Sequence, residues 1–264
     1  MTSYQTTHDE RDWALVTGAS GGLGQAFARH LARCGVNVAL TGRRREVLEQ
    51  LADELRVSHG VDVVVHPCDI AVESERLDLV SDLSSRGISV ETLVNNAGFG
   101  TLGEVSQLDP VRLNQEVAVN CEAVVHLCAL LVPGMLAAGQ GSIVNVASTA
   151  AFQPLPGFAT YAATKAFVLS FTRALWAETR GTGVRVTAIC PGPTETGFFD
   201  VAGSDEMMAM ARRDPDQVVR TAFDALAHHR PDAVDGLVNR IGARLASLAP
   251  TRLTMAAARA ALGG

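Results

Sequence analysis

A tyrosine and a lysine lie four residues apart in this chain, as Tyr161 and Lys165, shortly after Ser148. If the segment from Phe158 onward is helical, the two side chains lie on one helix face, one turn apart, within reach of a common ligand. A phenol has an ordinary pKa of about 10, and an ammonium held nearby favours the phenolate and lowers that pKa. Tyr161 could therefore exchange a proton with a substrate oxygen, to which Ser148 could donate a hydrogen bond.

The Tyr-x-x-x-Lys spacing also arises by chance, so the elements around it decide how it is interpreted. The apolar run at residues 142–147 predicts a strand that ends at Ser148, and residues 158–180 predict the helix that carries Tyr161 and Lys165. A catalytic serine at a strand end and two catalytic side chains on the next helix would meet at one edge of a sheet.

A glycine-rich loop follows the first predicted strand, at residues 14–16. Gly18, Gly22 and Gly24 are spaced Gly-x-x-x-Gly-x-Gly, and a helical pattern comes next. Glycines allow such a turn unusual backbone angles and let its N–H groups approach a pyrophosphate at the positive end of the helix. The alternative is an ordinary tight turn, but the position of the loop in the first β–α unit favours nucleotide binding.

The end of the second predicted strand, at residues 36–41, indicates which nucleotide is bound. An acidic residue there would bind the ribose 2′-hydroxyl of NAD, but Gly42 fills that position and Arg43, Arg44 and Arg45 follow. A guanidinium suits a 2′-phosphate, so NADP(H) is predicted in preference to NAD(H). The alternative is that these arginines are only the solvated start of the helix that runs to about His59.

Further strands are predicted at residues 61–68, 90–94 and 184–189, and each is separated from the next by a helical pattern. This alternation predicts an α/β protein with a single doubly wound parallel sheet, a Rossmann fold with helices on both faces. Asp69 follows one strand, where it could bond an adenine amino group or cap the next helix. Asn95 and Asn96 follow the strand predicted at residues 90–94. Their buried amides would join neighbouring strand ends, and Gly98, two residues later, would let the cofactor pass close.

Asn120 lies in the apolar part of a long helical pattern from Asp109 to about Ala138. A buried amide must find partners or it destabilises the fold by a few kcal/mol, on the order of 2. Asn120 either holds a water that connects Lys165 to solvent or bonds a neighbouring carbonyl, and the sequence does not choose between these two roles.

The composition restricts the function classes. With 264 residues, 47% hydrophobic and 19% charged, the chain fits one soluble α/β domain, and its net charge of −6 argues against a nucleic-acid surface. Five scattered cysteines and the histidine spacing predict neither a disulfide framework nor a metal site, so a reducing, cytoplasmic location is expected. Residues 1–12 lack the apolar core of a signal peptide and no uninterrupted apolar stretch reaches about 18 residues, so no transmembrane segment is predicted.

Taken together, these motifs resemble the classical short-chain dehydrogenase/reductase family. The resemblance covers residues 13 to about 196 and consists of Thr17-Gly18-x-x-x-Gly22-x-Gly24, Asp69, Asn95-Asn96-Ala97-Gly98, Asn120, Ser148, Tyr161-x-x-x-Lys165 and Pro191-Gly192-x-x-x-Thr196. Each motif is weak alone, but their occurrence in the family's order supports a catalytic role for Tyr161.

The resemblance implies a catalytic tetrad and hydride transfer between a nicotinamide and a carbonyl or alcohol carbon. Tyr161 would be the general acid/base, Ser148 would orient and polarise the carbonyl, Lys165 would bind the nicotinamide ribose and lower the tyrosine pKa, and Asn120 would hold a proton-relay water. Implied cofactor contacts are Gly18, Ser20, Gly22, Gly24, Asp69, Ile70, Asn96, Gly98, Tyr161, Lys165, Thr194 and Thr196. Arg43 matches the position found in NADP-preferring members, whereas Gly21 replaces a second basic residue, so the NADP preference depends on Arg43 and Arg44.

We therefore expect a flexible tail at residues 1–12, a catalytic domain at 13–239 with a substrate lid at about 195–212, and a helical extension at 240–264. The apolar lid predicts a hydrophobic carbonyl substrate, although its apolar residues could simply anchor the segment. The extension could cover the substrate mouth, join subunits, contact a membrane surface or pack on the sheet edge. The resemblance implies a homodimer or homotetramer.

The predicted function is that of an NADP(H)-dependent oxidoreductase acting on a small hydrophobic molecule. One alternative is a catalytically silent cofactor-sensing or interaction protein with the same fold. Another is an epimerase or dehydratase of the same superfamily, which shares Tyr-x-x-x-Lys but usually has a longer C-terminal domain.

Overall fold

Aliphatic and β-branched runs form a seven-stranded parallel sheet. The computed structural model describes residues 12–195, 213–250, 252, 254 and 255, and its strand order is β3-β2-β1-β4-β5-β6-β7, every neighbouring pair being parallel. The strands are β1 (Trp13–Thr17), β2 (Asn37–Gly42), β3 (Val63–Pro67), β4 (Val90–Asn95), β5 (Gly141–Val146), β6 (Val184–Cys190) and β7 (Asp232–Val234). The strand order reverses between β1 and β4, and ligands of open α/β sheets bind at such a point.

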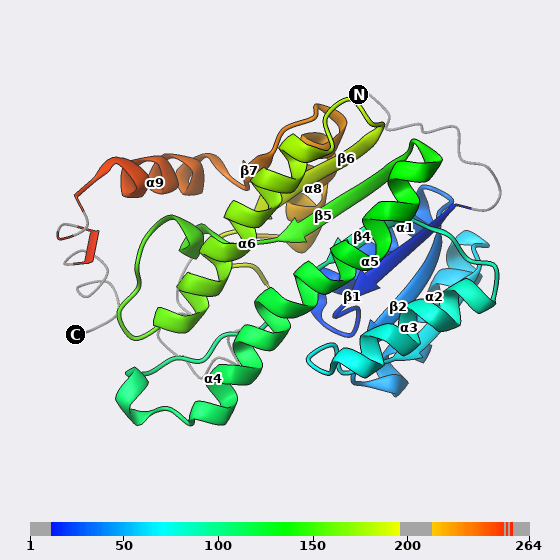
Figure 1. Cartoon of the computed structure of the whole chain (residues 1–264), viewed down its shortest axis with the longest axis horizontal. Coiled ribbons are helices and arrows are strands. Elements are labelled where there is room, and N and C mark those ends of the chain that lie inside the picture. The colour runs from blue at the N-terminus through cyan, green and yellow to red at the C-terminus, as the bar shows by residue number, and fades with distance from the viewer. Residues whose placement is uncertain (1–11, 196–212, 251, 253, 256–264) are drawn as a thin grey trace.

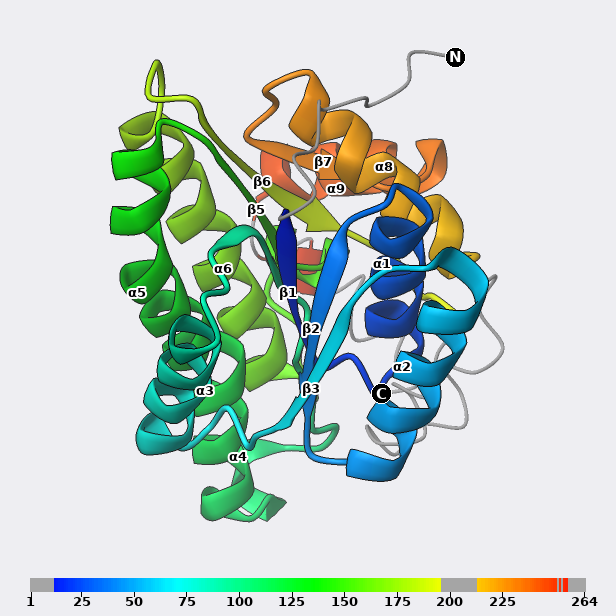
Figure 2. The ribbon, with the colours of Figure 1, turned by 90° about the vertical axis from the view of Figure 1, so that its right-hand side faces the viewer.

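Helices cover both faces of the sheet (Figure 2). Helices α1, α2 and α8 lie on one face, and α3, α5 and α6 on the other. The bounds are α1 (Gly22–Arg33), α2 (Arg45–His59), α3 (Glu73–Ser85), α4 (Pro110–Val117), α5 (Ala123–Ala138), α6 (Ala159–Glu178), α8 (Pro215–Ala227) and α9 (Leu237–Leu248). Strand β2 is buried at every position, as expected for a parallel strand covered on both faces. The predicted fold class is thus confirmed.

The long helix predicted from Asp109 contains a π-helical turn around Asn120. Helices α4 and α5 join through a π-helical turn, Ala118–Glu122, with Asn120 at its centre. A π-turn inserts one extra residue and shifts the phase of the side chains that follow. Residues 110–138 form one helix that by length and composition alone could cross a membrane, but it packs against β4, β5 and α6 as part of the layer that carries Asn120.

Amide side chains join the strand ends, as the sequence predicts. The Asn95 amide donates to Asn145 Oδ1 at 2.9 Å, and the Asn145 amide donates to Thr172 Oγ1 at 2.9 Å. Asn96 Nδ2 donates to the Thr17 carbonyl at 2.9 Å, which connects β4 to the glycine loop after β1. These bonds fix the edge of the sheet at which the candidate site lies.

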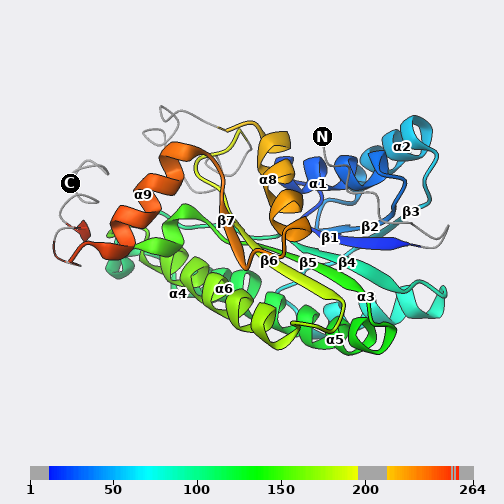
Figure 3. The ribbon, with the colours of Figure 1, turned by 90° about the horizontal axis from the view of Figure 1, so that it is seen from above.

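The C-terminal part differs from the expected boundaries. Helix α9 begins at Leu237, immediately after β7, so the boundary expected at residue 239 falls inside a helix. Figures 1 and 3 show α9 beyond the β7 edge, at one end of the long axis of the molecule. Asp214 caps α8 by accepting a hydrogen bond from the Asp216 N–H at 2.9 Å. The predicted tail, up to residue 11, and the lid from residue 196 lie outside the described residues.

Candidate active site

Four side chains from three elements meet at the carboxyl edge of the sheet. Ser148 follows β5, Tyr161 and Lys165 lie one turn apart on α6, and Asn120 lies in the π-turn. Their exposed fractions are 8%, 8%, 4% and 0%, in that order. The lysine Nζ lies 5.7 Å from the centroid of the tyrosine ring, so the predicted one-face arrangement is present.

Lys165 is a buried cation. Its Nζ donates a hydrogen bond of 2.8 Å to the Val146 carbonyl at the end of β5. Burial lowers the pKa of Lys165 to about 8, because the low-dielectric surroundings disfavour the ammonium. Cys121, Cys190 and Glu116 act in the opposite direction, and burial is the largest cause.

Tyr161 has a higher pKa here, not the lower one expected from the sequence. Burial raises the pKa of Tyr161 to about 12, while a hydrogen bond with Ser148 acts in the opposite direction. The cause is the apolar cluster that encloses the ring, formed with Ala150, Phe158 and Ala162 and flanked by Leu102 and Leu155. Desolvation is therefore the largest cause and sets the direction of the Tyr161 pKa shift.

Asn120 holds the loop that follows β4. Its Nδ2 donates to the Phe99 carbonyl at 2.9 Å and to Thr164 Oγ1 at 3.0 Å, and its Oδ1 accepts from the Phe99 N–H at 3.1 Å. The sequence leaves two roles open for Asn120, holding a water or bonding a neighbouring carbonyl. The structure shows the second of these contacts, with the Phe99 carbonyl. A Cβ added to Gly98 would lie 3.0 Å from Asn120 Oδ1 and 3.2 Å from Lys165 Nζ, so this loop passes close to both residues.

The glycine loop has the geometry that a pyrophosphate requires. Gly18 has a φ of +64°, and a Cβ on Gly24 would lie 2.3 Å from the Gly18 carbonyl oxygen. Asn96 Nδ2 also donates to that oxygen at 3.2 Å. Helix α1 begins at Gly22 with no side-chain hydrogen bond at its N-cap, Gly21, so its first N–H groups are available to an anion. The Asn96 amide therefore supports the loop, and its predicted contact with the cofactor stays a prediction.

The β2–α2 turn lies directly against the glycine loop. A Cβ on Gly42 would lie 3.2 Å from Ser20 Oγ, which explains the small residue where an acid would bind the NAD ribose. Arg44 Nη2 donates to the Ser20 carbonyl at 2.5 Å, and Arg43 is exposed beside it. The Arg44 guanidinium is therefore held at the loop and does not simply extend into solvent as the start of α2.

The remaining predicted cofactor residues follow β3 and β6. The Asp69 carboxylate accepts from the Ala71 N–H at 3.1 Å, whereas α3 has Val72 at its N-cap, so Asp69 forms a turn and does not cap the helix. Ile70 beside it is buried. Thr194 Oγ1 donates to the Gly192 carbonyl at 2.9 Å, and Thr196 lies outside the described residues.

Comparison with known proteins identifies the family. The chain matches the short chain dehydrogenase family over residues 12–207, more than half of its length. The protein belongs to this family. The dehydrogenase is 39% identical over 198 residues to sulfoacetaldehyde reductase 2 of Chromohalobacter salexigens, covering 74% of this chain and 78% of the relative. It is 35% identical over 196 residues to an NADP-dependent 3-hydroxy acid dehydrogenase of Salmonella typhi, covering 73% and 77%.

Solved structures agree with the sequence comparison. A short-chain dehydrogenase from Sphingobium yanoikuyae in complex with NADPH superposes with a TM-score of 0.81 at 29% identity, covering 88% of this chain and 92% of that one. In two further relatives the matching region is part of a longer chain, of which this dehydrogenase spans 15% and 58%. The protein is thus an NAD(P)-dependent oxidoreductase that acts on alcohol or carbonyl substrates.

The sequence reasoning missed one buried acid in this dehydrogenase. Glu116 lies one helical turn before Asn120 and is 0% exposed, and neither carboxylate oxygen has a hydrogen bond of good geometry. Burial raises the pKa of Glu116, while the nearby Thr101 hydroxyl and backbone N–H, Arg112 and Lys165 act to lower it. An acid four residues before Asn120, on the same helix face, was the available signal.

A second group outside the sequence prediction is Arg76 of α3, whose side chain is 1% exposed. It donates to the Ile70 carbonyl and Glu122 Oε1 at 2.5 Å each, and to His126 Nδ1 at 2.9 Å. Arg76 thereby connects the turn after β3 to the π-turn and α5. His126 thus takes part in a hydrogen-bond network with a buried guanidinium.

Proposed function

We propose that this enzyme is an NADP(H)-dependent carbonyl reductase or alcohol dehydrogenase in which Tyr161 is the general acid/base. The observation that supports the proposal best is the convergence of Ser148, Tyr161 and Lys165 at the end of β5, beside a glycine loop suited to a dinucleotide. Nicotinamide, when bound, supplies or accepts the hydride at the substrate carbon.

The proton step falls to this chain's own residues. In reduction, Tyr161 gives its phenolic proton to the substrate oxygen as the carbon gains the hydride, which leaves a phenolate to be reprotonated from solvent. Ser148 hydrogen-bonds the same oxygen and holds it beside the phenol. Lys165, fixed by the Val146 carbonyl, would bind the nicotinamide ribose, and Asn120 would hold the loop beside both groups.

The apolar surroundings of Tyr161 support a hydrophobic substrate. Leu102, Leu155 and Phe158 pack around the tyrosine, and their side chains would exclude water from the carbonyl. Arg43 and Arg44 beside the glycine loop support NADP(H) over NAD(H), since a guanidinium complements a 2′-phosphate.

The test is a fluorescence titration with NADPH and NADH, followed by a carbonyl panel scored by NADPH oxidation. We expect tighter NADPH binding, weakened about tenfold or more in Arg43→Ala with little change for NADH. Tyr161→Phe should retain NADPH binding and lose at least about a hundredfold in kcat. Binding of NADH alone would refute the arginine argument. Unchanged turnover in Tyr161→Phe would refute the assigned proton donor, and tight NADPH binding without turnover by the wild type would favour the sensing alternative.

We further propose that the enzyme forms a homodimer or homotetramer and that it works in a reducing, cytoplasmic compartment. All five cysteines are free thiols, which suits a reducing compartment. Val117, Leu136 and Phe167 are more than 40% exposed on α4, α5 and α6, and these helices would form a subunit interface. Light scattering at several protein concentrations tests this assembly.

A further inference from the structure

Helix α9 presents an apolar surface that the described structure leaves exposed. Leu237, Val238, Ile241, Leu245 and Leu248 are exposed by 68%, 82%, 51%, 64% and 83%. At about 100° of rotation per residue, these five positions fall within an arc of about 100°. We call this surface the α9 arc. Only Ala243 of α9 is buried among the described residues, so the helix contacts its own fold by the opposite side.

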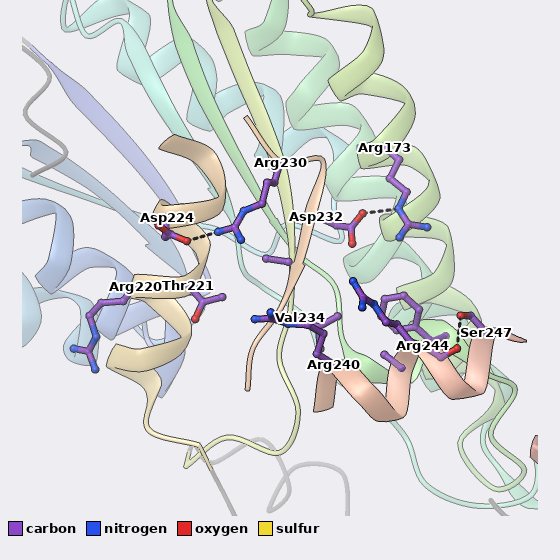
Figure 4. Close-up of a pocket in the computed structure, with 13 residues that line it drawn as sticks. Arg173, Arg220, Thr221, Asp224, Arg230, Asp232, Val234, Arg240, Arg244 and Ser247 are labelled. Carbon is purple, nitrogen blue, oxygen red and sulfur yellow. Dashed lines mark hydrogen bonds and ion pairs between the residues drawn. The ribbon is translucent and has the colours of Figure 1, made fainter. Parts of the chain in front are cut away.

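Arginines border this arc on the side that faces the sheet edge. Arg240 and Arg244 are exposed, and they line a cleft of about 580 Å³ between α9, β7, α8 and α6. Figure 4 shows Arg240 extending from α9 toward Thr221 of α8. The two acids of the cleft already have partners: Asp232 binds Arg173 at 2.7 Å, and Asp224 binds Arg230. Among the described residues no ion pair is formed by Arg240 or Arg244.

The charge pattern continues along the sequence. From Gly236 to the last residue the chain contains four arginines and no acidic residue, although the whole protein has a net charge of −6. A helix with an apolar arc and arginines at its border is typical of peptides that lie in the headgroup region of a membrane, where long basic side chains reach phosphate groups. Helix α9 lies at one end of the molecule (Figure 1), and the side chains of its arc are exposed there.

We propose that α9 docks on an anionic lipid surface, with the α9 arc in the headgroup layer and Arg240 and Arg244 on lipid phosphates. A second copy of the chain is a poorer occupant, because an antiparallel two-fold pairing of the arcs would place these arginines of both copies on the same side of the interface. A free phosphate compound would use the cleft but would leave the arc exposed. Docking would hold the enzyme where hydrophobic carbonyl compounds concentrate.

The experiment uses the full-length protein with NADP⁺ and two kinds of vesicle, phosphatidylcholine alone and phosphatidylcholine with phosphatidylglycerol, in a flotation assay. We expect binding to the anionic vesicles at least ten times tighter than to the neutral ones, and much weaker binding at high salt. The double variant Arg240→Gln/Arg244→Gln should bind about thirtyfold more weakly, and Ile241→Ser/Leu245→Ser at least tenfold more weakly. NADPH binding and turnover should not change in either variant.

Matched controls are Val57→Ser on α2, an aliphatic residue that is 87% exposed, and Arg33→Gln at the exposed end of α1. Both should bind vesicles like the wild type.

The proposal is overturned if the wild-type protein floats with neither vesicle, or if the control substitutions weaken binding as much as the α9 substitutions. Saturable pyrophosphate binding that needs the two arginines, without flotation, would assign the cleft to a soluble phosphate. If the wild type does not float and the variant Ile241→Ser/Leu245→Ser forms a smaller oligomer than the wild type, the α9 arc is an interface with a second copy of the chain. The salt and lipid comparison needs no variant, so misfolding of a variant cannot leave the question open.

Discussion

The buried ammonium of Lys165 should give the free enzyme a measurable pH dependence of stability. The folded protein holds the pKa of Lys165 at about 8, against 10.5 in the unfolded chain. The lysine pKa is lowered on folding, so between these values the unfolded state binds more protons and stability rises with pH. For one group with these values, the gain between pH 7.5 and pH 9.5 is about 2 kcal/mol.

This gain in the free energy of unfolding can be attributed to Lys165 only by comparing the wild type with Lys165→Met. Buried thiols such as Cys128, with its pKa raised to about 12, make the folded state lose stability as pH rises above 9, and this effect is common to both proteins. Urea unfolding under reducing conditions without cofactor, at pH 7.5 and 9.5, should show the stability of the wild type relative to Lys165→Met increasing by about 2 kcal/mol. A difference that stays constant between the two pH values would refute a buried lysine with a lowered pKa.

Three further predictions follow from the site. Glu116→Gln removes a buried carboxyl whose pKa is raised, so the variant should gain stability relative to the wild type as pH rises from 4 to 7, which urea unfolding would detect; a relative loss would mean that a partner stabilises the carboxylate in the folded state. Gly98→Val should lower kcat at least about tenfold and weaken NADPH binding, because its side chain would meet Asn120 and Lys165; kinetics equal to those of the wild type would contradict the close approach. Arg76→Met should lower the free energy of unfolding by about 2–4 kcal/mol, since charged hydrogen bonds from a buried guanidinium are lost; a change below about 0.5 kcal/mol in urea unfolding would show that they contribute little.

The sequence was sufficient for the fold because its signals are local and repeated. Alternating strand and helix patterns, the glycine loop after β1 and the polar residues at strand ends each report a short-range requirement of a parallel sheet. The placement of Tyr161 and Lys165 on one helix face follows from helix geometry alone. Hydrogen bonds from the Asn95 side chain to Asn145 and from Asn145 to Thr172 are present. The sequence could predict that such bonds exist, because buried amides need partners, but it could not predict which partners they have.

Other features depend on contacts that no local pattern reports. The π-turn at Asn120 has no distinct propensity signal, since Ala118 to Glu122 suit an α-helix equally well. The direction of the Tyr161 pKa shift was wrong because it is decided by enclosure among Phe158, Leu102 and Leu155, which come together only in the folded chain. The partners of Arg76 are likewise 6, 46 and 50 residues away along the chain.

Taken together, the buried groups determine the charge of the catalytic site. At pH 7 the phenol of Tyr161, with its pKa near 12, is neutral, and Lys165, with its pKa near 8, carries a positive charge; an ionised Glu116 on the facing helix would offset that charge. Each of these two charges favours the ionised form of the other, and each is opposed by burial. Loss of the carboxylate would therefore make Lys165 easier to deprotonate, while Tyr161 would become easier to ionise. Burial is thus the largest cause of both pKa shifts, and Glu116, an acid outside the catalytic motifs, adds to it at Tyr161 and opposes it at Lys165.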